Sequence, residues 1–523
     1  MMQWRLWGAL SAGMAVLAMN GPGGLPGLAV PEGRGSGAIS PNQQPLGEIS
    51  KLRRELTELI NQPKYAAAFW GIKIVSLDTG RTLFEHNAQK LLSPASNCKL
   101  YTVAVALDRL GADYRIKTSL YAATRPNAGG FLEGDLIVYG RGDPTINEKL
   151  QGGDTFKALE ALVRALTNAG VKRIKGDLVG DDSFFRGPEF GSGWAWDDAE
   201  YSYGAEISAL TINENTVKLS AMPGARAGIP AALALLSPAP YLVLSNRTVT
   251  IEKGGSRALT FYRPLEENVV YVSGQVPLTG AGQIEEVPVH NPAGLFVALF
   301  KEALARHGIE VEGIARTTHW LDRQAAPLDC SKLIELGSAE SLPLSEIARQ
   351  IEKPSQNLYA DLLLDQVGEW ARSPGDTNRT SEELGIAELE KFLQEAGIKR
   401  DEVFFEEGSG LSRNNLATPE ATVALLAFMS RHKAAETYLA ALPIAGVDGT
   451  LRNRMKGTRA AGDVRAKTGS LRWADSLSGY VTTAAGERLA FCLMLNRSNG
   501  GSARLDLDAI AVKLAGLKDR VGS

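Results

Sequence analysis

The sequence predicts an α+β protein in which a five-stranded antiparallel sheet, flanked by helices, is interrupted by β-rich inserted domains. Two observations lead to this fold class. Strand patterns near the start of the chain are matched by strand and helix patterns at its far end, and the segment between them changes to short β-like runs. A chain of 523 residues is also too long for one compact core, so roughly two to four domains are expected.

The chain begins with the features of a secretory signal. Arg5 precedes the apolar stretch LWGALSAGMAVLAM, which fits a charged start and a short hydrophobic core. The stretch is short for a spanning helix, which needs about 20 apolar residues. A glycine- and proline-rich tether follows and isolates the stretch, so a buried helix of the fold is the less favoured alternative. We therefore expect a signal peptide at residues 1–30, a flexible linker at 31–46 and a folded part outside the cytoplasm.

Both chain ends supply strands to the predicted sheet. Residues 47–62 carry apolar side chains at helical spacing, and residues 69–92 alternate around the turn DTG, as a β-hairpin does. Near the other end, the patterns predict a strand at 463–471, a hairpin at 476–498 and a closing helix at 503–519. Two N-terminal and three C-terminal strands would then form one antiparallel sheet between the first and last helices.

A further helix is predicted after the first hairpin, within SPASNCKLYTVAVALDRLG. Ser93 suits the N-cap, Pro94 the first helical position and Gly111 the position just past the C-terminal end. Ser96 would then lie in the first turn, where the helix dipole and unpaired N–H groups favour negative charge.

The middle of the chain, from about residue 116 to 340, is predicted to be an insertion. It contains short β-like runs such as GDLIVYG and ENVVYVSGQVPL, and one clear helix, PAGLFVALFKEALARHG. The predicted division is a sheet domain at 47–118 and 340–523, an inserted domain II at 119–207 and 318–339, and an inserted domain III at 208–317.

Composition and the pattern of ionisable residues exclude several classes of site. With 56 basic and 59 acidic residues the net charge is −3, which gives no long-range reason to bind nucleic acid or an anionic membrane surface. Cys98, Cys330 and Cys492 lie far apart, and the five histidines form no metal-binding pattern. We therefore expect chemistry that uses no metal and no cofactor.

Three short motifs follow one another in the predicted sheet domain. Ser96 and Lys99 form a Ser-x-x-Lys pattern, and Ser355 and Asn357 form a Ser-x-Asn pattern. Lys467 opens a Lys-Thr-Gly pattern that occurs once, on a predicted strand. The ordered trio is much more specific than its parts.

The first two patterns recur elsewhere, and context decides between the copies. SRHK at 430–433 follows the end of a predicted helix, whereas Ser96 lies at a helix start. Ser-x-Asn recurs at 40–42 in the tether and at 412–414. Ser355 is favoured because it follows a proline and opens an amphipathic run, so that a loop-to-helix junction can aim both side chains into a cleft.

The trio is the signature of penicillin-binding proteins and class A β-lactamases. The chain resembles the D-alanyl-D-alanine carboxypeptidase/endopeptidases, low-molecular-mass class C penicillin-binding proteins with large domains inserted between the first two motifs. The resemblance runs from about residue 47 to the end and includes LIVYGRGDPTI, GWAWDD, EEGSGLSRNNLATP, LPIAGVDGTL and KTGSL. It implies a penicillin-binding/serine β-lactamase-like transpeptidase domain with a helical subdomain. It also implies secretion across the inner membrane to the periplasm or cell envelope.

Ser96 and Lys99 have the chemistry of a nucleophile and its base. A serine hydroxyl needs a neighbouring base, and a lysine can serve if its pKa falls from about 10.4 toward neutrality. Helical i,i+3 spacing puts Lys99 beside Ser96, and the charges of Lys467 and of the helix N-terminus would lower its pKa. The backbone N–H of Ser96 is one donor for the oxyanion, and Gly469 lets the substrate backbone lie close to its strand.

The resemblance implies the remaining catalytic roles, position by position. The N–H of Ser470 is the second oxyanion donor. Ser355 relays a proton to the leaving amine, and Asn357 holds the substrate amide. Lys467 and Thr468 bind a terminal carboxylate.

The resemblance also implies a specificity pocket. Asp198, Arg413 and Tyr203 occupy the positions that line a pocket for the side-chain end of diaminopimelate, which bears an amine and a carboxylate. The alternative for the segment GWAWDD is a purely structural role, in which its aromatic side chains form a core patch and its two acidic side chains are solvated.

The expected function is that of a serine-type D-Ala-D-Ala carboxypeptidase/endopeptidase, inhibited by β-lactams, which acts on peptidoglycan stem peptides and cross-links through a Ser96 acyl-enzyme. A serine β-lactamase would need a deacylating Glu-x-x-Leu-Asn type loop, which the sequence does not contain. A non-catalytic cell-wall peptide-binding protein would be expected to lack Ser96, Lys99 or Lys467. The expected partners are peptidoglycan peptides and β-lactams, with no nucleic acid. Peripheral membrane association and the oligomeric state stay open.

Overall fold

The structure, a computed structural model, describes residues 47–499, 501 and 503–521. The expected signal peptide at 1–30 and linker at 31–46 lie outside these described residues. Within the described ranges, no helix has both the length and the apolar character that a membrane crossing requires.

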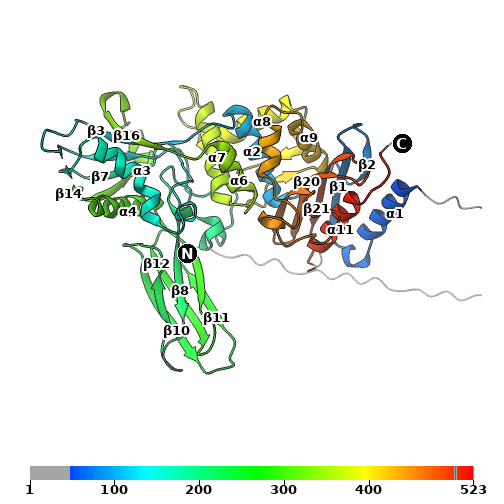
Figure 1. The fold of residues 1–523 in the computed structure, drawn as a ribbon, viewed down its shortest axis with the longest axis horizontal. Helices are drawn as coiled ribbons and strands as arrows, with labels where there is room; N and C mark the ends of the chain where they lie inside the picture. The colour runs from blue at the N-terminus through cyan, green and yellow to red at the C-terminus, as the bar shows by residue number, and fades with distance from the viewer. Residues whose placement is uncertain (1–46, 500, 502, 522–523) are drawn as a thin grey trace, which may run out of the picture. The chain divides into compact units, whose positions relative to one another are not determined.

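The central sheet is built from both ends of the chain, as predicted (Figure 1). Its strands are β1 (Phe69–Ser76), β2 (Thr82–His86), β19 (Arg465–Leu471), β20 (Ala474–Thr482) and β21 (Arg488–Asn496). They lie in the order β19-β20-β21-β1-β2, and each neighbouring pair is antiparallel. The predicted α+β fold with a five-stranded antiparallel sheet is therefore confirmed.

Helices cover both faces of this sheet, and the alternation of side chains along β21 shows why. Its odd-numbered residues from Leu489 to Leu495 pack in a core with α1 (Glu48–Ile60) and α11 (Ala503–Ala515). Ala490, Cys492 and Met494 face the opposite way, into a core of helices. Because both faces are buried, β21 is a nearly continuous apolar run rather than an alternating one.

Six helices form the second core, and two of the three motifs lie at helices of this group. Apolar residues of all six helices pack together in one cluster. The helices are α2 (Cys98–Arg109), α6 (Leu344–Glu352), α7 (Asn357–Ala371), α8 (Ser381–Glu395), α9 (Pro419–Met429) and α10 (Ala435–Ala441). α2 is buried along most of its length, which places the Ser-x-x-Lys motif at the end of a helix fixed on several sides.

The helix with the Ser-x-x-Lys motif begins later than predicted. A 3-10 turn at Ala95–Asn97 leads into α2, so Ser93 and Pro94 are not its N-cap and first residue. The Ser93 hydroxyl finds no hydrogen-bond partner among the described residues, and its backbone N–H donates over 2.8 Å to a side chain at the end of β21. This contact with the sheet overrides the local capping pattern. Gly111 follows the helix with a φ of 87°, as predicted for that position.

The insertion forms one five-stranded sheet and three smaller ones within the described residues. The larger sheet has the order β15-β7-β5-β3-β16, with β3 (Lys117–Ala122), β5 (Leu136–Tyr139), β7 (Leu178–Asp181), β15 (Ala315–Thr318) and β16 (Ile334–Glu340). Residues of α3 (Thr155–Asn168) and α4 (Pro292–Arg306) share its core. The predicted boundary between residues 118 and 119 falls inside β3, and the domain division stays a prediction.

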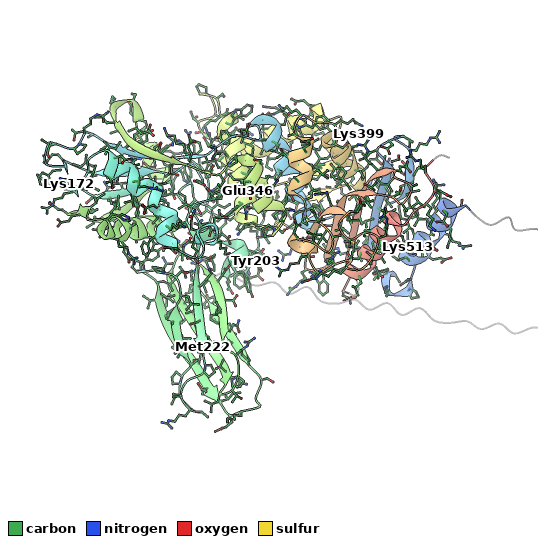
Figure 2. All side chains as sticks on the ribbon, viewed as in Figure 1. Lys172, Tyr203, Met222, Glu346, Lys399 and Lys513 are labelled. Atoms are coloured by element: carbon green, nitrogen blue, oxygen red, sulfur yellow. The ribbon has the colours of Figure 1, made fainter. Side chains whose placement is uncertain are left out.

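The smaller sheets of the insertion have three strands each. One contains β4 (Phe131–Leu132), β6 (Arg173–Ile174) and β14 (Glu310–Val311). A second contains β8 (Thr216–Met222), β9 (Ala232–Leu235) and β13 (Gln283–Pro288), and a third β10 (Val243–Ile251), β11 (Ala258–Tyr262) and β12 (Val269–Pro277). Figure 2 labels Met222, which is exposed at the end of β8.

Candidate functional site

Ser96 lies on the 3-10 turn ahead of α2 and lines an open cavity of about 790 Å³. The preceding Ala95 has a φ of 48°, which is uncommon for a residue with a side chain. A Cβ added at Gly410 would lie 2.1 Å from the Ala95 carbonyl oxygen, and one added at Gly469 would lie 2.6 Å from the Pro94 carbonyl oxygen. The segments around Gly410 and Gly469 therefore pack so closely against the turn before α2 that only glycine fits at these two positions. This packing holds the strained turn on which Ser96 lies.

Lys99 is fully buried one helical turn after this serine. Its Nζ donates to Ser96 Oγ over 3.0 Å, to Asn357 Oδ1 over 2.7 Å and to the Ser409 carbonyl oxygen over 2.5 Å. Burial lowers the pKa of Lys99, while nearby carboxylates, Glu407 first, oppose that shift. Lys99 therefore contacts the serine and is biased toward the neutral form that a base needs.

Lys467 on β19 forms a second lysine–serine pair. Its Nζ donates over 2.7 Å both to Ser355 Oγ and to the Thr468 carbonyl oxygen. Burial lowers the pKa of Lys467 to about 7; the charge of Lys99 acts in the same direction and Glu352 opposes it. Ser355 has a φ of 69° and lines the same cavity as Ser96. The structure thus brings the three sequence motifs together.

The rest of the Lys-Thr-Gly strand forms a wall of this cavity. Thr468 Oγ1 donates over 2.8 Å to Thr450 Oγ1, and Ser470 Oγ donates over 2.7 Å to Asp475 Oδ1. Other parts of the cavity carry cationic side chains that no sequence pattern indicated: Lys353, Arg452, Arg454 and Arg504. Lys353, Arg454 and Arg504 form ion pairs with aspartates. Arg452 forms none within the described residues, so it can bind a ligand that ends in a carboxylate.

The three expected specificity residues also reach the site. Asp198 Oδ2 accepts from Arg413 Nη1 at 3.3 Å. The carbonyl oxygen of Tyr203, a residue labelled in Figure 2, accepts from Asn357 Nδ2 at 2.9 Å. Trp196 is 72% exposed and Asp198 only 4%, so an aromatic core patch with a solvated acidic pair does not describe this segment.

Two buried carboxylic acids of the site were missed in the sequence. Glu407 accepts from the N–H groups of Ser409 and Gly410 at 2.9 and 2.7 Å, and thereby fixes the loop whose carbonyl oxygen meets Lys99. Glu352 lies at the end of α6, fully buried, and interacts electrostatically with Lys467 and Lys99. The glycines of EEGSG indicated a tight loop, but no sequence pattern indicated which acid would be buried.

The alternative Ser-x-x-Lys copy at 430–433 makes other contacts. Lys433 Nζ donates to the Asp108 carbonyl oxygen over 3.1 Å, and Ser430 Oγ donates to the Ala427 carbonyl oxygen over 2.8 Å. The Cys98 thiol beside the reactive serine is buried, and burial raises its pKa. These residues therefore form no second nucleophile with a base.

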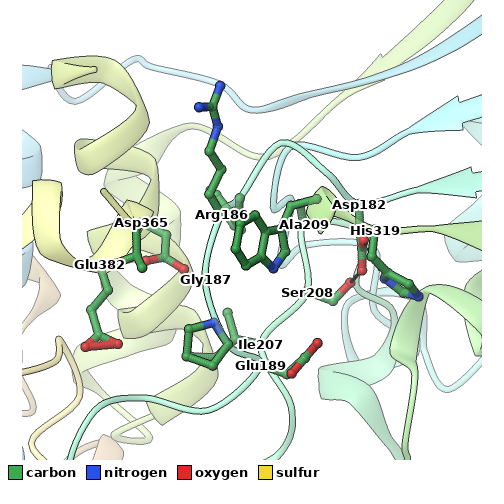
Figure 3. A pocket seen from close by; sticks show the side chains of 14 residues that line it. Asp182, Arg186, Gly187, Glu189, Ile207, Ser208, Ala209, His319, Asp365 and Glu382 are labelled. Carbon is green, nitrogen blue, oxygen red and sulfur yellow. Dashed lines mark hydrogen bonds and ion pairs between the residues drawn. The ribbon is translucent and has the colours of Figure 1, made fainter. Parts of the chain in front are cut away.

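A smaller pocket, of about 40 Å³, contains none of the motif residues (Figure 3). Its Asp182 accepts from Ser208 Oγ at 2.8 Å and lies 2.8 Å from His319 Nδ1. Because the serine and the histidine both bind this carboxylate instead of each other, the histidine does not activate the serine.

Known proteins resemble this chain over most of its length. Residues 52–517 match the D-Ala-D-Ala carboxypeptidase 3 (S13) family. The D-alanyl-D-alanine carboxypeptidase of Actinomadura sp. (strain R39) is 34% identical over 478 residues, which cover 89% of this chain and 85% of that protein. D-alanyl-D-alanine carboxypeptidase DacB of Haemophilus influenzae is 26% identical over 435 residues, which cover 82% of this chain and 85% of that protein.

Solved structures give the same result. The crystal structure of penicillin binding protein 4 (dacB) from H. influenzae matches with a TM-score of 0.75 and 25% identity, covering 89% of this chain and 98% of that one. The expected penicillin-binding fold and enzyme class are thereby confirmed, and the chain belongs to the D-Ala-D-Ala carboxypeptidase 3 (S13) family.

Proposed function

We propose that this chain is a serine-type D-Ala-D-Ala carboxypeptidase/endopeptidase that cleaves peptidoglycan stem peptides and cross-links through a Ser96 acyl-enzyme. The observation that carries the proposal is the convergence of two lysine–serine pairs on one cavity: Lys99 with Ser96, and Lys467 with Ser355. A non-catalytic binding protein has no use for two buried lysines held against hydroxyls, since burying such charges costs free energy.

Acylation follows from these contacts. Lys99 takes the hydroxyl proton while Ser96 Oγ bonds to the carbonyl carbon of the penultimate D-alanine, whose oxygen becomes anionic. The N–H groups of Ser96 and Ser470 stabilise this oxyanion, each contributing about 3 kcal/mol. The C–N bond then breaks, and Ser355, in contact with Lys467, passes its proton to the leaving amine. The proton that Lys99 took from Ser96 replaces the one that Ser355 gave up, so Lys99 is neutral again in the acyl-enzyme.

Deacylation returns the enzyme to its starting state. A water molecule adds to the ester carbon and gives a proton to the neutral Lys99. The ester C–O bond then breaks, and Lys99 returns that proton to Ser96 Oγ, which releases the shortened peptide and regenerates Ser96. The same acyl-enzyme serves a terminal D-alanine and a cross-link, because the two reactions differ only in what the leaving amine carries.

Inhibition by β-lactams belongs to the same proposal. A β-lactam amide offers Ser96 a strained carbonyl, and after ring opening the leaving amine stays attached to the acyl-enzyme, which slows hydrolysis. The names of relatives support this: a penicillin-sensitive carboxypeptidase A of Dictyostelium discoideum is 28% identical over 422 residues. A signal peptide at 1–30 and export to the periplasm or cell envelope would bring the enzyme to its polymer substrate.

The products from purified muropeptides test this function. A pentapeptide monomer should lose one D-alanine and a cross-linked dimer should give two monomers, as read by mass spectrometry. Ser96→Ala should abolish both reactions, whereas Ser430→Ala, in the alternative motif copy, should retain them. Unchanged muropeptides, or equal turnover by the Ser96→Ala variant, would disprove the proposal.

A further inference from the structure

We propose that a second groove, next to the specificity pocket, binds the sugar-bearing and carboxylate-bearing end of a muropeptide. We call it the strand-end groove; its volume is about 710 Å³ and its lining includes Phe69, Leu91, Arg413, Leu471, Trp473 and Arg497. It lies where β19 and β20 meet and where β1 begins. This inference rests on the proposed function, and it adds the part of the substrate that lies beyond the scissile peptide.

Large apolar side chains are exposed along this groove. Phe69 is 58% exposed and Trp473 is 53% exposed. Exposed aromatic groups gathered on one surface mark a ligand or partner site more often than a plain solvated surface. The flat face of an aromatic ring also packs well against the C–H face of a sugar, which is how aromatic side chains commonly bind glycans.

The charge of the groove is wholly positive. Four cationic side chains line it, and no Asp or Glu does. Arg413 pairs with Asp198, whereas Lys90, Arg472 and Arg497 form no ion pair within the part of the chain that the structure describes. Because the whole protein has a net charge of −3, this local excess is not a general surface property. Arginines with open donor sites suit carboxylates.

Two residues at the groove have a positive φ, and one of them is the exposed Trp473. Leu471 pairs with Ala474, so Arg472 and Trp473 form the two-residue turn between β19 and β20. Trp473 has a φ of 70°, at a turn position where glycine is favoured. Arg497 also has a positive φ, of 59°, and its N–H donates to the Trp473 carbonyl oxygen over 2.6 Å. Strain of this kind is typically retained at functional sites.

The groove lies beside the proposed active site, at the end of β19. Ser470 lines the catalytic cavity and the next residue, Leu471, lines the groove. Arg413 contacts Asp198 of the specificity pocket and also lines the groove. With D-Ala-D-Ala in the catalytic cavity, the stem peptide continues toward its glutamyl carboxylate and the amino sugar to which it is attached. The cations fit the carboxylate and Trp473 fits the sugar.

Two substrates separate this groove from the catalytic machinery. The first is a disaccharide pentapeptide, and the second is a short acyl peptide with the same diaminopimelate side chain before D-Ala-D-Ala but without sugar or glutamyl residue. We expect Trp473→Asn and Arg472→Gln each to lower kcat/KM about tenfold for the first substrate. Neither variant should change kcat/KM for the second. Asparagine is chosen at position 473 because it tolerates a positive φ. The matched controls are Trp370→Ala, which removes a tryptophan that is 52% exposed on α7, and Arg431→Ala.

Each outcome of this experiment has a distinct meaning. Equal kcat/KM values of wild type and both groove variants on the disaccharide pentapeptide would overturn the groove inference while the proposed function stands. A wild-type enzyme that cleaves neither substrate would overturn the proposed function and the groove inference with it. If the variants instead lose binding to phosphatidylglycerol vesicles while muropeptide kinetics stay unchanged, the surface contacts a membrane and the inference is wrong.

Discussion

Three ionisable side chains are buried behind the reactive serine, and their charges depend on one another. Glu352 has no hydrogen-bond partner for either carboxylate oxygen among the described residues, and burial raises its pKa to about 7. Lys467 and Lys99 oppose that rise, and Glu352 in turn raises the pKa of both lysines. The three groups therefore titrate together, and burial keeps Glu352 protonated to a higher pH than an exposed glutamate.

Replacing Glu352 should change the pH dependence of the enzyme. In Glu352→Gln the charge that raises the pKa of Lys467 is gone, so Lys467 loses its proton at lower pH and the alkaline limb of kcat/KM moves to lower pH. The acid limb should move less, because the wild-type Glu352 is largely protonated there. Glu346→Gln, on the exposed side of the same helix, is the matched control. A Glu352→Gln profile that overlays the wild type would contradict this coupling.

The specificity pocket makes a second prediction at the residue scale. If Asp198 binds the amine of diaminopimelate and Arg413 its carboxylate, each charge-assisted contact contributes about 1.5–3 kcal/mol. Asp198→Ala should therefore lower kcat/KM for diaminopimelate peptides about tenfold or more, and hardly affect acylation by benzylpenicillin, which lacks that amine. Asp197→Ala, at an exposed neighbouring position, is the control. Equal losses toward both compounds would point to general damage.

At the scale of elements, the close approach of β19 to the turn before α2 would position the proposed oxyanion donors. A Cβ added at Gly469 would lie 3.0 Å from Ser96 N and 2.2 Å from Ser476 Oγ. Ser476 Oγ itself donates to the Pro94 carbonyl oxygen over 2.7 Å, so the strand and the turn are already joined there. A larger residue at Gly469 must push the two elements apart.

Gly469→Ala should therefore slow acylation with little change in overall fold. Loss of one oxyanion donor costs about 10²–10³ in kcat, and we expect a decrease of that order in the rate of acylation by benzylpenicillin, measured by stopped-flow fluorescence. Gly375→Ala is the matched control, since nothing lies within 4 Å of an added Cβ there. A Gly469→Ala enzyme that acylates at the wild-type rate would show that the close approach is not needed.

The predictions made from sequence succeeded where local patterns carry the information. The hairpins and terminal helices that build the central sheet were predicted from their periodicity, and the motifs from their order. The N-cap at Ser93 was wrong because a contact with β21 holds that segment. Glu352 and Glu407 were missed because burial of a carboxylic acid depends on distant segments, which local spacing does not reveal.

At the scale of the whole molecule, the site forms only when distant parts of the chain meet. β1 pairs along its length with β21, which joins the two ends of the described chain. Asp198 and Tyr203 come from the insertion, and they contact Arg413 and Asn357 beyond it. The insertion therefore contributes directly to the proposed specificity pocket, and the surroundings of Ser96 depend on elements from both ends of the described chain.

The most direct test of the account is the site of covalent attachment of benzylpenicillin, measured by intact-protein mass spectrometry and peptide mapping. We expect one adduct, on Ser96, in the wild type and in Lys433→Ala, because Lys433 is exposed and binds Asp108. Lys99→Ala should acylate at least about 10²-fold more slowly, with its circular dichroism spectrum unchanged. An adduct on another residue, no adduct on the wild type after prolonged incubation, or equal acylation rates of the two lysine variants would contradict a Ser96 acyl-enzyme with Lys99 as its base.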